Sequence, residues 1–277
     1  MSLFIDSHTH LDDEAFNDDR EVIISNFKND GVLFAVNASS DMASSKNSVG
    51  LTKHDNIYAV VGVHPHEAKY FKESDIDIYK EMLKNPKVVG IGECGLDYHY
   101  DLSDRETQKK VFERFINFAN EVDYPLVIHT REATKDTIDL LSALRKGKTL
   151  IHCFTAPKEV ARDYLNLGYY LSIGGAVTFK NAKHVVESVE YAPLNRLLLE
   201  TDAPYMTPVP FRGKRNEPKY INYVVDKIAE IKGISRETVI ETTTKNAREF
   251  YNIWLKRLLL LKARMILQGS KKRLMRM

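Results

Sequence analysis

The chain has 277 residues, of which 43% are hydrophobic and 28% are charged, as in an ordinary globular protein. This length suits a single α/β barrel, and two cysteines are too few for a disulfide-stabilised scaffold and fit a reducing compartment. No apolar stretch is long enough to span a bilayer, and the N-terminus lacks the pattern of a signal peptide. We therefore expect a cytoplasmic protein that has no membrane segment.

The net charge of +2 is unevenly distributed along the chain. Residues 255–277 contain eight lysines and arginines and no acidic residue, so the remainder is mildly acidic. Overall charge therefore does not indicate nucleic-acid binding. We divide the chain into a barrel domain over 1–254 and a basic tail over 255–277. Leucines at helical spacing predict a helix in the tail, which either packs on the barrel or a neighbouring subunit or anchors to a membrane surface or nucleic acid. We favour packing and assign the tail no role.

Short apolar runs alternate with segments of helical spacing throughout the domain. Strands are expected over 3–6, 32–38, 58–63, 88–92, 125–129, 149–153, 169–173 and 197–201. Helices are expected over 17–29, 41–53, 75–85, 104–122, 133–145, 157–167, 181–192, 218–232, 235–246 and 247–254. The pattern predicts an α/β fold, a (β/α)8 TIM barrel with a C-terminal helical extension. An open doubly wound sheet is the rival, but it would gather ligands at one switch point.

Imidazoles and carboxylates recur just past five of the expected strands. Because the carboxyl ends of barrel strands meet at one rim, we expect these side chains to converge. A single histidine would more often be a buried, hydrogen-bonded residue, but a complete set in barrel order favours a metal site. The expected metal ligands are His8, His10, Glu93, His129, His152 and Asp202.

The spacing of these residues predicts two ions. His8 and His10 lie two apart on an extended segment, so they face the same side and can chelate one ion. His129 and His152 follow adjacent strands and can hold the other, with Glu93 as the bridge. Asp202 completes the shell of the first ion or accepts a proton from its water. Imidazole and carboxylate suit zinc, manganese or iron, and magnesium is less natural with so many nitrogen ligands. The expected cofactor is two divalent ions, with zinc, manganese and magnesium as the candidates.

Such a centre predicts a hydrolase. Two ions that share a carboxylate generate hydroxide near neutral pH and stabilise charge on the attacked group. The bond that is hydrolysed is a phosphoester, an ester or an amide. The cluster alone does not choose among these. We expect Glu93, Asp202 and His64 to be catalytic; His64 follows the third strand and is either a proton donor or phosphate contact, or a structural residue.

Loops after the strands carry the candidates for substrate binding. Arg131 can offer its planar guanidinium to a phosphate, or can form a salt bridge with a nearby glutamate. Tyr98 and Tyr100 can stack on bases, or can be packing residues. Phe154 also follows a strand, and the basic segment 211–216 would attract a polyanion. Together these residues favour a phosphorylated substrate.

Ordered motifs over most of the domain resemble the TatD family of metal-dependent deoxyribonucleases. The resemblance implies a nuclease that trims single-stranded DNA in the 3′-to-5′ direction, acts in DNA repair or turnover, is a monomer, and needs no stable protein partner and no membrane. It implies the same ligand roles as above. The alternatives are an amidohydrolase or deacylase, for example on aminoacyl-tRNA, and a non-catalytic barrel that binds a ligand. The matching segments are Phe4 to Leu11, Gly62 to His66, Gly90 to Tyr98, Pro125 to Arg131, Ile151 to Phe154, Leu199 to Pro204, Arg212-Gly213, Glu217-Pro218 and Thr244 to Ala247.

Overall fold

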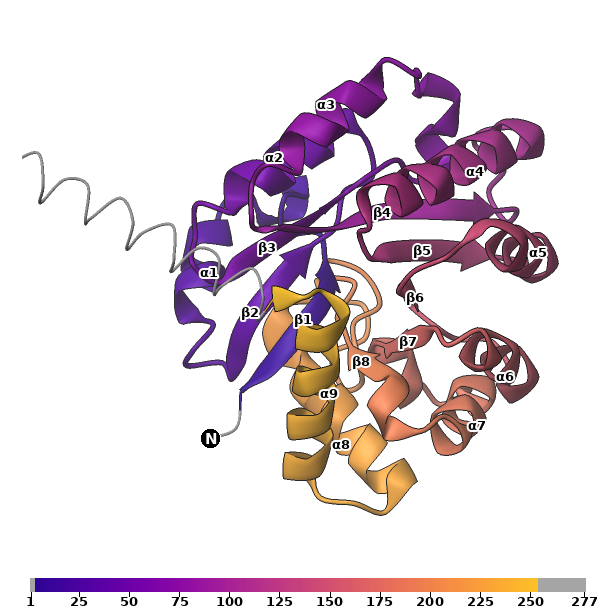
Figure 1. The fold of residues 1–277 in the computed structure, drawn as a ribbon. Helices are drawn as coiled ribbons and strands as arrows, with labels where there is room; N and C mark the ends of the chain where they lie inside the picture. Colours follow the sequence, from indigo (N-terminus) through magenta and orange to yellow (C-terminus); the bar gives the residue numbers. More distant parts are fainter. Residues whose placement is uncertain (1–2, 254–277) are drawn as a thin grey trace, which may run out of the picture.

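The structure, a computed structural model, describes residues 3–253. Within them, eight parallel strands lie side by side in sequence order and curve into a barrel, as predicted (Figure 1). The strands are β1 (Phe4–Thr9), β2 (Val32–Asn37), β3 (Ile57–Val61), β4 (Val88–Asp97), β5 (Leu126–Arg131), β6 (Thr149–Ile151), β7 (Tyr170–Ile173) and β8 (Leu197–Leu199).

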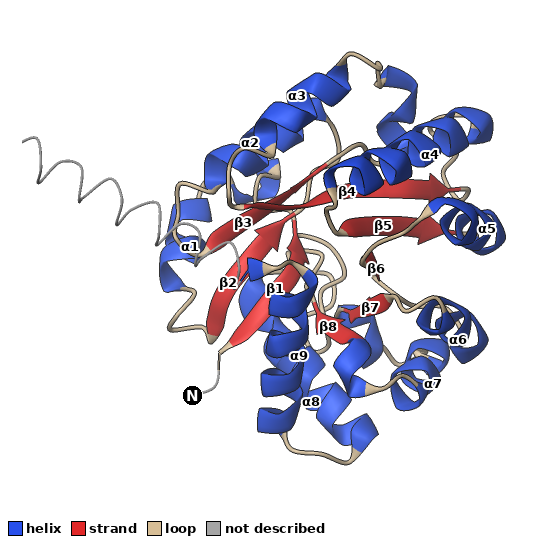
Figure 2. Ribbon diagram, in the orientation of Figure 1, coloured by secondary structure: helices blue, strands red, loops and turns tan. Residues whose placement is uncertain are grey.

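Helices connect successive strands and surround the sheet (Figure 2). The expected boundary between two helices at residue 246 is wrong, because one helix continues through Ala247, which is buried at the end of the barrel, to Phe250. The predictions for the tail 255–277 and for the domain boundary at 254 concern residues outside the described part of the chain. The helices are α1 (Arg20–Asn26), α2 (Met42–Leu51), α3 (Asp75–Met82), α4 (Arg105–Val122), α5 (Thr134–Leu144), α6 (Lys158–Asn166), α7 (Lys183–Tyr191), α8 (Ile221–Lys232) and α9 (Arg236–Phe250), with short 3-10 turns η1 (Glu14–Phe16), η2 (Pro65–Tyr70), η3 (Gly175–Thr178), η4 (Leu194–Arg196) and η5 (Pro218–Tyr220).

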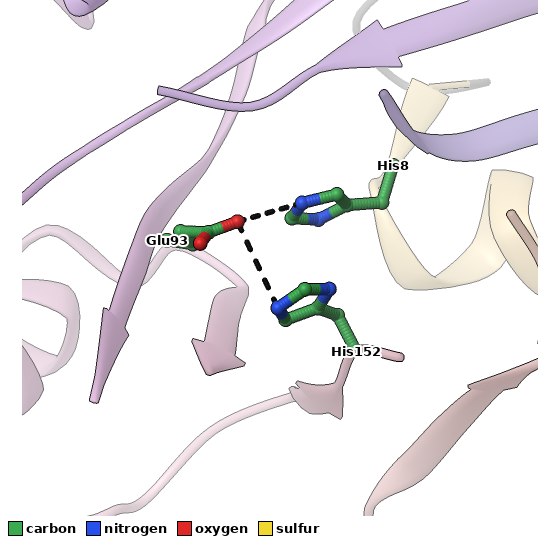
Figure 3. Close-up of side chains that lie close together, drawn as sticks. All are labelled: His8, Glu93 and His152. Carbon is green, nitrogen blue, oxygen red and sulfur yellow. Dashed lines mark ion pairs between the residues drawn. The ribbon is translucent and has the colours of Figure 1, made fainter. Parts of the chain in front are cut away.

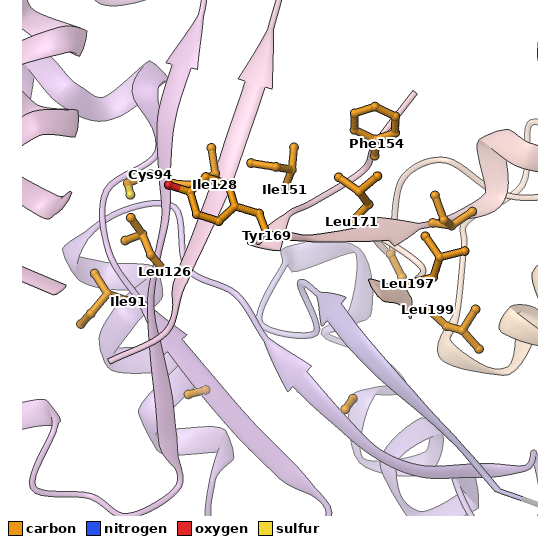
Figure 4. Packing of buried hydrophobic residues seen from close by; sticks show 14 of the residues in the cluster. Ile91, Cys94, Leu126, Ile128, Ile151, Phe154, Tyr169, Leu171, Leu197 and Leu199 are labelled. Atoms are coloured by element: carbon orange, nitrogen blue, oxygen red, sulfur yellow. The ribbon is translucent and has the colours of Figure 1, made fainter. Parts of the chain in front are cut away.

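Apolar side chains bury both faces of the strands, which explains why the strand sequences lack polar alternation. One layer packs between strands and helices and includes Ile91, Cys94 and Leu126 (Figure 4). The other layer fills the barrel interior, where strand residues meet Phe250 and Tyr251 at the end of α9. The Tyr251 hydroxyl donates to the backbone oxygen of Ser7 at 2.8 Å. The end of α9 therefore plugs the barrel and leaves the carboxyl ends of the strands to form a site.

A buried carboxylate joins the last strand to the first. Asp6 accepts the Thr201 backbone N–H at 3.0 Å and its hydroxyl at 2.6 Å. The Asp202 N–H donates to the backbone oxygen of His8 at 3.0 Å. This closure places Asp202 beside β1, although the two residues are almost two hundred positions apart in the sequence. In the part of the chain that is described, no helix has the length and apolar character needed to cross a membrane.

Candidate metal centre

All six expected ligands lie at the carboxyl end of the barrel. They come from β1, β4 and β5 or directly follow β1, β6 and β8, and they are mostly buried. Their side chains converge over the barrel interior, where the apolar layer supports them from below. The fold thus places together six residues that are spread over most of the chain: His8, His10, Glu93, His129, His152 and Asp202.

Glu93 lies at the centre of the cluster, and each of its oxygens faces different imidazoles. Oε2 is 2.7 Å from His8 Nε2 and 3.8 Å from His152 Nε2 (Figure 3). Oε1 is 3.2 Å from His64 Nε2 and 3.8 Å from His129 Nδ1. A carboxylate in this position can share its two oxygens between two cations.

The donor atoms form three overlapping sets. The first joins His8, Glu93 and His152, the second joins His8, His10 and Asp202, and the third joins His64, Glu93 and His129. The grouping differs in part from the expected couples, because the His8 ring stacks on His152, with centroids 4.0 Å apart. His64, which was expected to be catalytic, also belongs to one of these donor sets.

The buried polar atoms fit bound cations. Within residues 3–253, no hydrogen bond satisfies Glu93 Oε2, although His8 Nε2 and His10 Nε2 lie 2.7 and 3.7 Å away. His10 Nε2 is also 3.2 Å from His8 Nε2 and 3.3 Å from Asp202 Oδ1. Nitrogen and oxygen atoms that converge in this way are stabilised by a cation between them. The donor set thus suits divalent metal ions.

The protonation states also suit metal binding. Burial raises the pKa of Glu93, but the imidazoles of His152 and His8 outweigh this effect and hold that pKa well below its usual range. Burial also lowers the pKa values of His64 and His152 well below the usual value for histidine. Ionised carboxylate and neutral imidazole are the forms that bind metals. Burial lowers the pKa of His10 too, but its hydrogen bond to Asp202 raises the net value to about 10, so a metal would displace a proton there.

Asp97 and Glu200 lie next to the expected ligands on the side away from Glu93, and neither role was predicted from the sequence. Asp97 Oδ2 accepts from His129 Nε2 at 3.0 Å and lies 3.1 Å from His66 Nε2. Glu200 accepts the Cys153 N–H at 2.6 Å, and its Oε1 lies 3.9 Å from His152 Nδ1.

The position of Asp97 follows from the length of β4. The strand was expected to end at residue 92 but continues to Asp97. Residues two apart on a strand share a face, so an extended β4 places Glu93 and Asp97 on the same side. His66 lines the same cavity.

Replacing Asp97 by asparagine is expected to weaken metal binding about 10- to 100-fold. The Asp97 carboxylate only accepts, so it keeps a proton on His129 Nε2 and leaves Nδ1 free to face Glu93. The amide of asparagine can donate to Nε2 instead, which would favour a proton on Nδ1. Titration of metal-free protein with zinc or manganese measures the effect. Asp104→Asn is the matched control, because asparagine also caps α4 and residue 104 lies outside the cavity wall; equal affinity of Asp97→Asn and wild type would contradict this role.

A cavity of about 860 Å³ opens above the cluster and holds some of the expected substrate residues but not others. Arg131 lines it, and its guanidinium lies 4.9 Å from the centre of the Tyr100 ring. Tyr98 does not line it; its hydroxyl donates to Asp136 at 2.7 Å on the outer side of the barrel. Phe154 is 3% exposed and packs in the core between strands and helices. We therefore withdraw Tyr98 and Phe154 as substrate contacts.

The basic segment 211–216 also lies outside the cavity wall. Arg215 donates to both oxygens of Asp19, at 2.8 and 2.6 Å, and the Arg212 guanidinium lies 3.8 Å from the Phe179 ring centre. These contacts hold the segment against neighbouring structure, so the expectation that it attracts the substrate has no support here. Cys153 lines the cavity.

Comparison with known proteins agrees with this geometry. A family model described as TatD related DNase matches residues 5–252. The chain belongs to this family. The uncharacterized metal-dependent hydrolase YabD of Bacillus subtilis (strain 168) is 42% identical over 254 residues, which cover 91% of this chain and 100% of that protein. The TatD family is therefore established here by sequence as well as by motif.

Two further members extend the comparison. The uncharacterized metal-dependent hydrolase YcfH of Escherichia coli (strain K12) is 34% identical over 263 residues, covering 92% of this chain and 97% of that protein. Among solved structures, the TatD homolog YJJV of Escherichia coli K12 superposes with a TM-score of 0.84 at 26% identity, covering 90% of this chain and 98% of that one. The TatD barrel is thus the fold of this chain.

Proposed function

We propose that this TatD-family chain is a dinuclear metal-dependent hydrolase that cleaves phosphodiester bonds of DNA. The position of Glu93 carries the proposal, since its two oxygens face separate groups of imidazoles. The description of the matching family supplies the substrate class. Zinc, manganese and magnesium are the candidate ions.

The chain's own residues divide the work. His8, His10 and Asp202 would hold one ion, and His129 and His152, whose Nδ1 and Nε2 atoms lie 3.2 Å apart, would hold the other, with Glu93 shared between them. When bound, the ions activate water for attack and stabilise negative charge on the phosphate. Asp202 Oδ1 lies at the edge of the cluster, 3.3 Å from His10, and is placed to receive a proton.

Two further residues complete the proposed site. His64 lies at the inner wall of the cavity, 3.2 Å from Glu93, where its imidazole can contact the phosphate or serve as an additional ligand. The position of Arg131 favours a substrate that contains a phosphate. Among residues 3–253, it is the one lysine or arginine in the cavity wall, and no hydrogen bond or ion pair occupies its guanidinium. A free guanidinium beside a metal centre suits a phosphodiester better than an uncharged ester or amide.

Several finer expectations belong to the same proposal. They are 3′-to-5′ cleavage of single strands, a role in DNA repair, a monomeric state without a stable protein partner, and a cytoplasmic location without membrane attachment. Each stays a prediction.

Nucleotide release from single-stranded DNA tests the proposal directly. Metal-free protein is supplied with zinc, manganese or magnesium and assayed on DNA, on an aminoacyl-tRNA and on an N-acyl amide. We expect nucleotide release that a chelator lowers at least about 1,000-fold and that added metal restores. Turnover of the ester or amide alone would replace the nuclease by a deacylase or an amidohydrolase. DNA binding without any turnover would indicate a non-catalytic barrel.

A further inference from the structure

Two tyrosines in the cavity wall expose much of their rings to solvent. Tyr100 follows β4 and Tyr205 follows β8, and each is 54% exposed. In an eight-stranded barrel that runs in sequence order, β4 and β8 lie across from each other. The two rings therefore stand on opposite sides of the mouth, with the metal cluster between them.

Each ring is fixed in place by contacts that leave it exposed. The Tyr205 hydroxyl donates to Asp13 Oδ2 at 3.1 Å. Tyr100 has the Arg131 guanidinium 4.9 Å from its ring centre, and the edge-on His99 ring lies 4.6 Å away. A single exposed aromatic residue needs no explanation. Two anchored rings that flank a hydrolytic centre suit flat ligands such as nucleobases, which stack on aromatic side chains whatever their sequence.

The charges around the two rings differ in sign. Asp12, Asp13 and Asp41 line the cavity beside Tyr205, on the loops after β1 and β2. Arg131, the one lysine or arginine of the cavity wall among the described residues, lies on the Tyr100 side, where the carboxylate of Asp97 is already hydrogen-bonded to His129. A phosphodiester chain is therefore favoured next to Tyr100 and repelled next to Tyr205.

We propose that this site takes an unpaired end of a DNA strand, with the terminal base stacked on Tyr205 and the penultimate base on Tyr100. The strand then leaves on the side of Arg131, which contacts its phosphates. The acidic part of the cavity next to Tyr205 accepts one nucleoside but repels any phosphate beyond it. The site therefore accepts the end of a strand and not its middle. A paired duplex cannot bind in this way, because its base faces are already stacked. This inference rests on the proposed nuclease function and deepens it.

Oligonucleotides that lack single bases test the two stacking positions. The probes are fluorescein-labelled thymidine decamers, either intact or with an abasic site at the terminal or the penultimate position of either end. The terminal linkages are phosphorothioates, which slow hydrolysis, and fluorescence anisotropy with manganese-loaded protein measures the dissociation constant. Loss of either base is expected to weaken binding by wild type about 5- to 150-fold, the range that corresponds to the usual stacking energy per base.

Tyrosine variants assign each base to a ring. Tyr205→Ala should bind intact DNA as weakly as wild type binds DNA without its terminal base, with no further loss when both changes are combined. Tyr100→Ala should behave in the same way with the penultimate base, and both phenylalanine variants should keep wild-type affinity. Tyr191→Ala, an exposed tyrosine on α7 outside the cavity, is the matched control.

The outcomes separate this inference from the proposed function. Nucleotide release that is indifferent to missing bases, or equal binding of single strands and blunt duplexes, overturns the stacking inference and leaves the nuclease in place. Wild type that releases no nucleotide from any DNA overturns the proposed function itself. Circular dichroism of each variant checks that a loss of affinity is not a loss of fold.

Discussion

Glu93→Gln is expected to lower DNA hydrolysis at least about 1,000-fold, equivalent to about 4 kcal/mol of transition-state stabilisation. The substitution keeps the volume of the side chain but removes its charge and replaces one oxygen by a donor. Because Oε2 faces His8 and Oε1 faces His64, either orientation of the amide turns an N–H₂ group toward a metal-binding set. We therefore expect metal content to fall together with activity, as measured by elemental analysis and single-turnover kinetics.

The matched control is Glu113→Gln on the outer face of α4, where the carboxylate is exposed and lies far from the cavity wall. It should keep wild-type metal content and rate. Thermal unfolding of both variants separates loss of metal from loss of fold. Full metal occupancy and full activity in Glu93→Gln would contradict the bridging role.

The six expected ligands could be predicted from sequence because their positions obey simple geometry. A parallel barrel brings all strand ends to one rim, so a residue such as Asp202 needs only its place after an apolar run to be assigned. The period of two along strands likewise predicts that His8 and His10 share a side. These rules depend on chain order and not on side-chain packing, and they hold in the structure.

The supporting and substrate residues needed more than those rules. The pairing of β4 with β5 shifts register between Ile91 and Cys94, so the phase of the later residues cannot be counted from the start of the strand. That phase decides that Asp97 faces the cluster while the neighbouring Tyr98 points outward. The contacts of Arg131 could not be predicted either, because the sequence is compatible both with a salt bridge to a glutamate and with the observed stack on Tyr100. Such choices depend on three-dimensional packing.

Gly95→Ala is expected to destabilise the fold by about 3 kcal/mol or more and to disrupt the metal site. Gly95 has φ of +143° and pairs with His129 in the ladder between β4 and β5. A Cβ atom at this position would lie 1.9 Å from the His129 backbone oxygen. Relief requires separation of the two strands, which adds the cost of overpacking to that of a strained backbone. The same movement displaces the His129 imidazole from Glu93, so metal affinity should fall with stability.

Gly50→Ala gives the contrasting result on which this argument depends. Gly50 lies in α2, and no atom comes within 4 Å of the Cβ position. Alanine there restricts the unfolded chain without a clash, so we expect stabilisation of about 0.5–1 kcal/mol. Urea unfolding of both variants measures the difference. Both substitutions add one methyl group, so stability changes of opposite sign attribute the loss in Gly95→Ala to the close approach of β4 and β5. An unfolding midpoint of Gly95→Ala equal to that of wild type would refute this explanation.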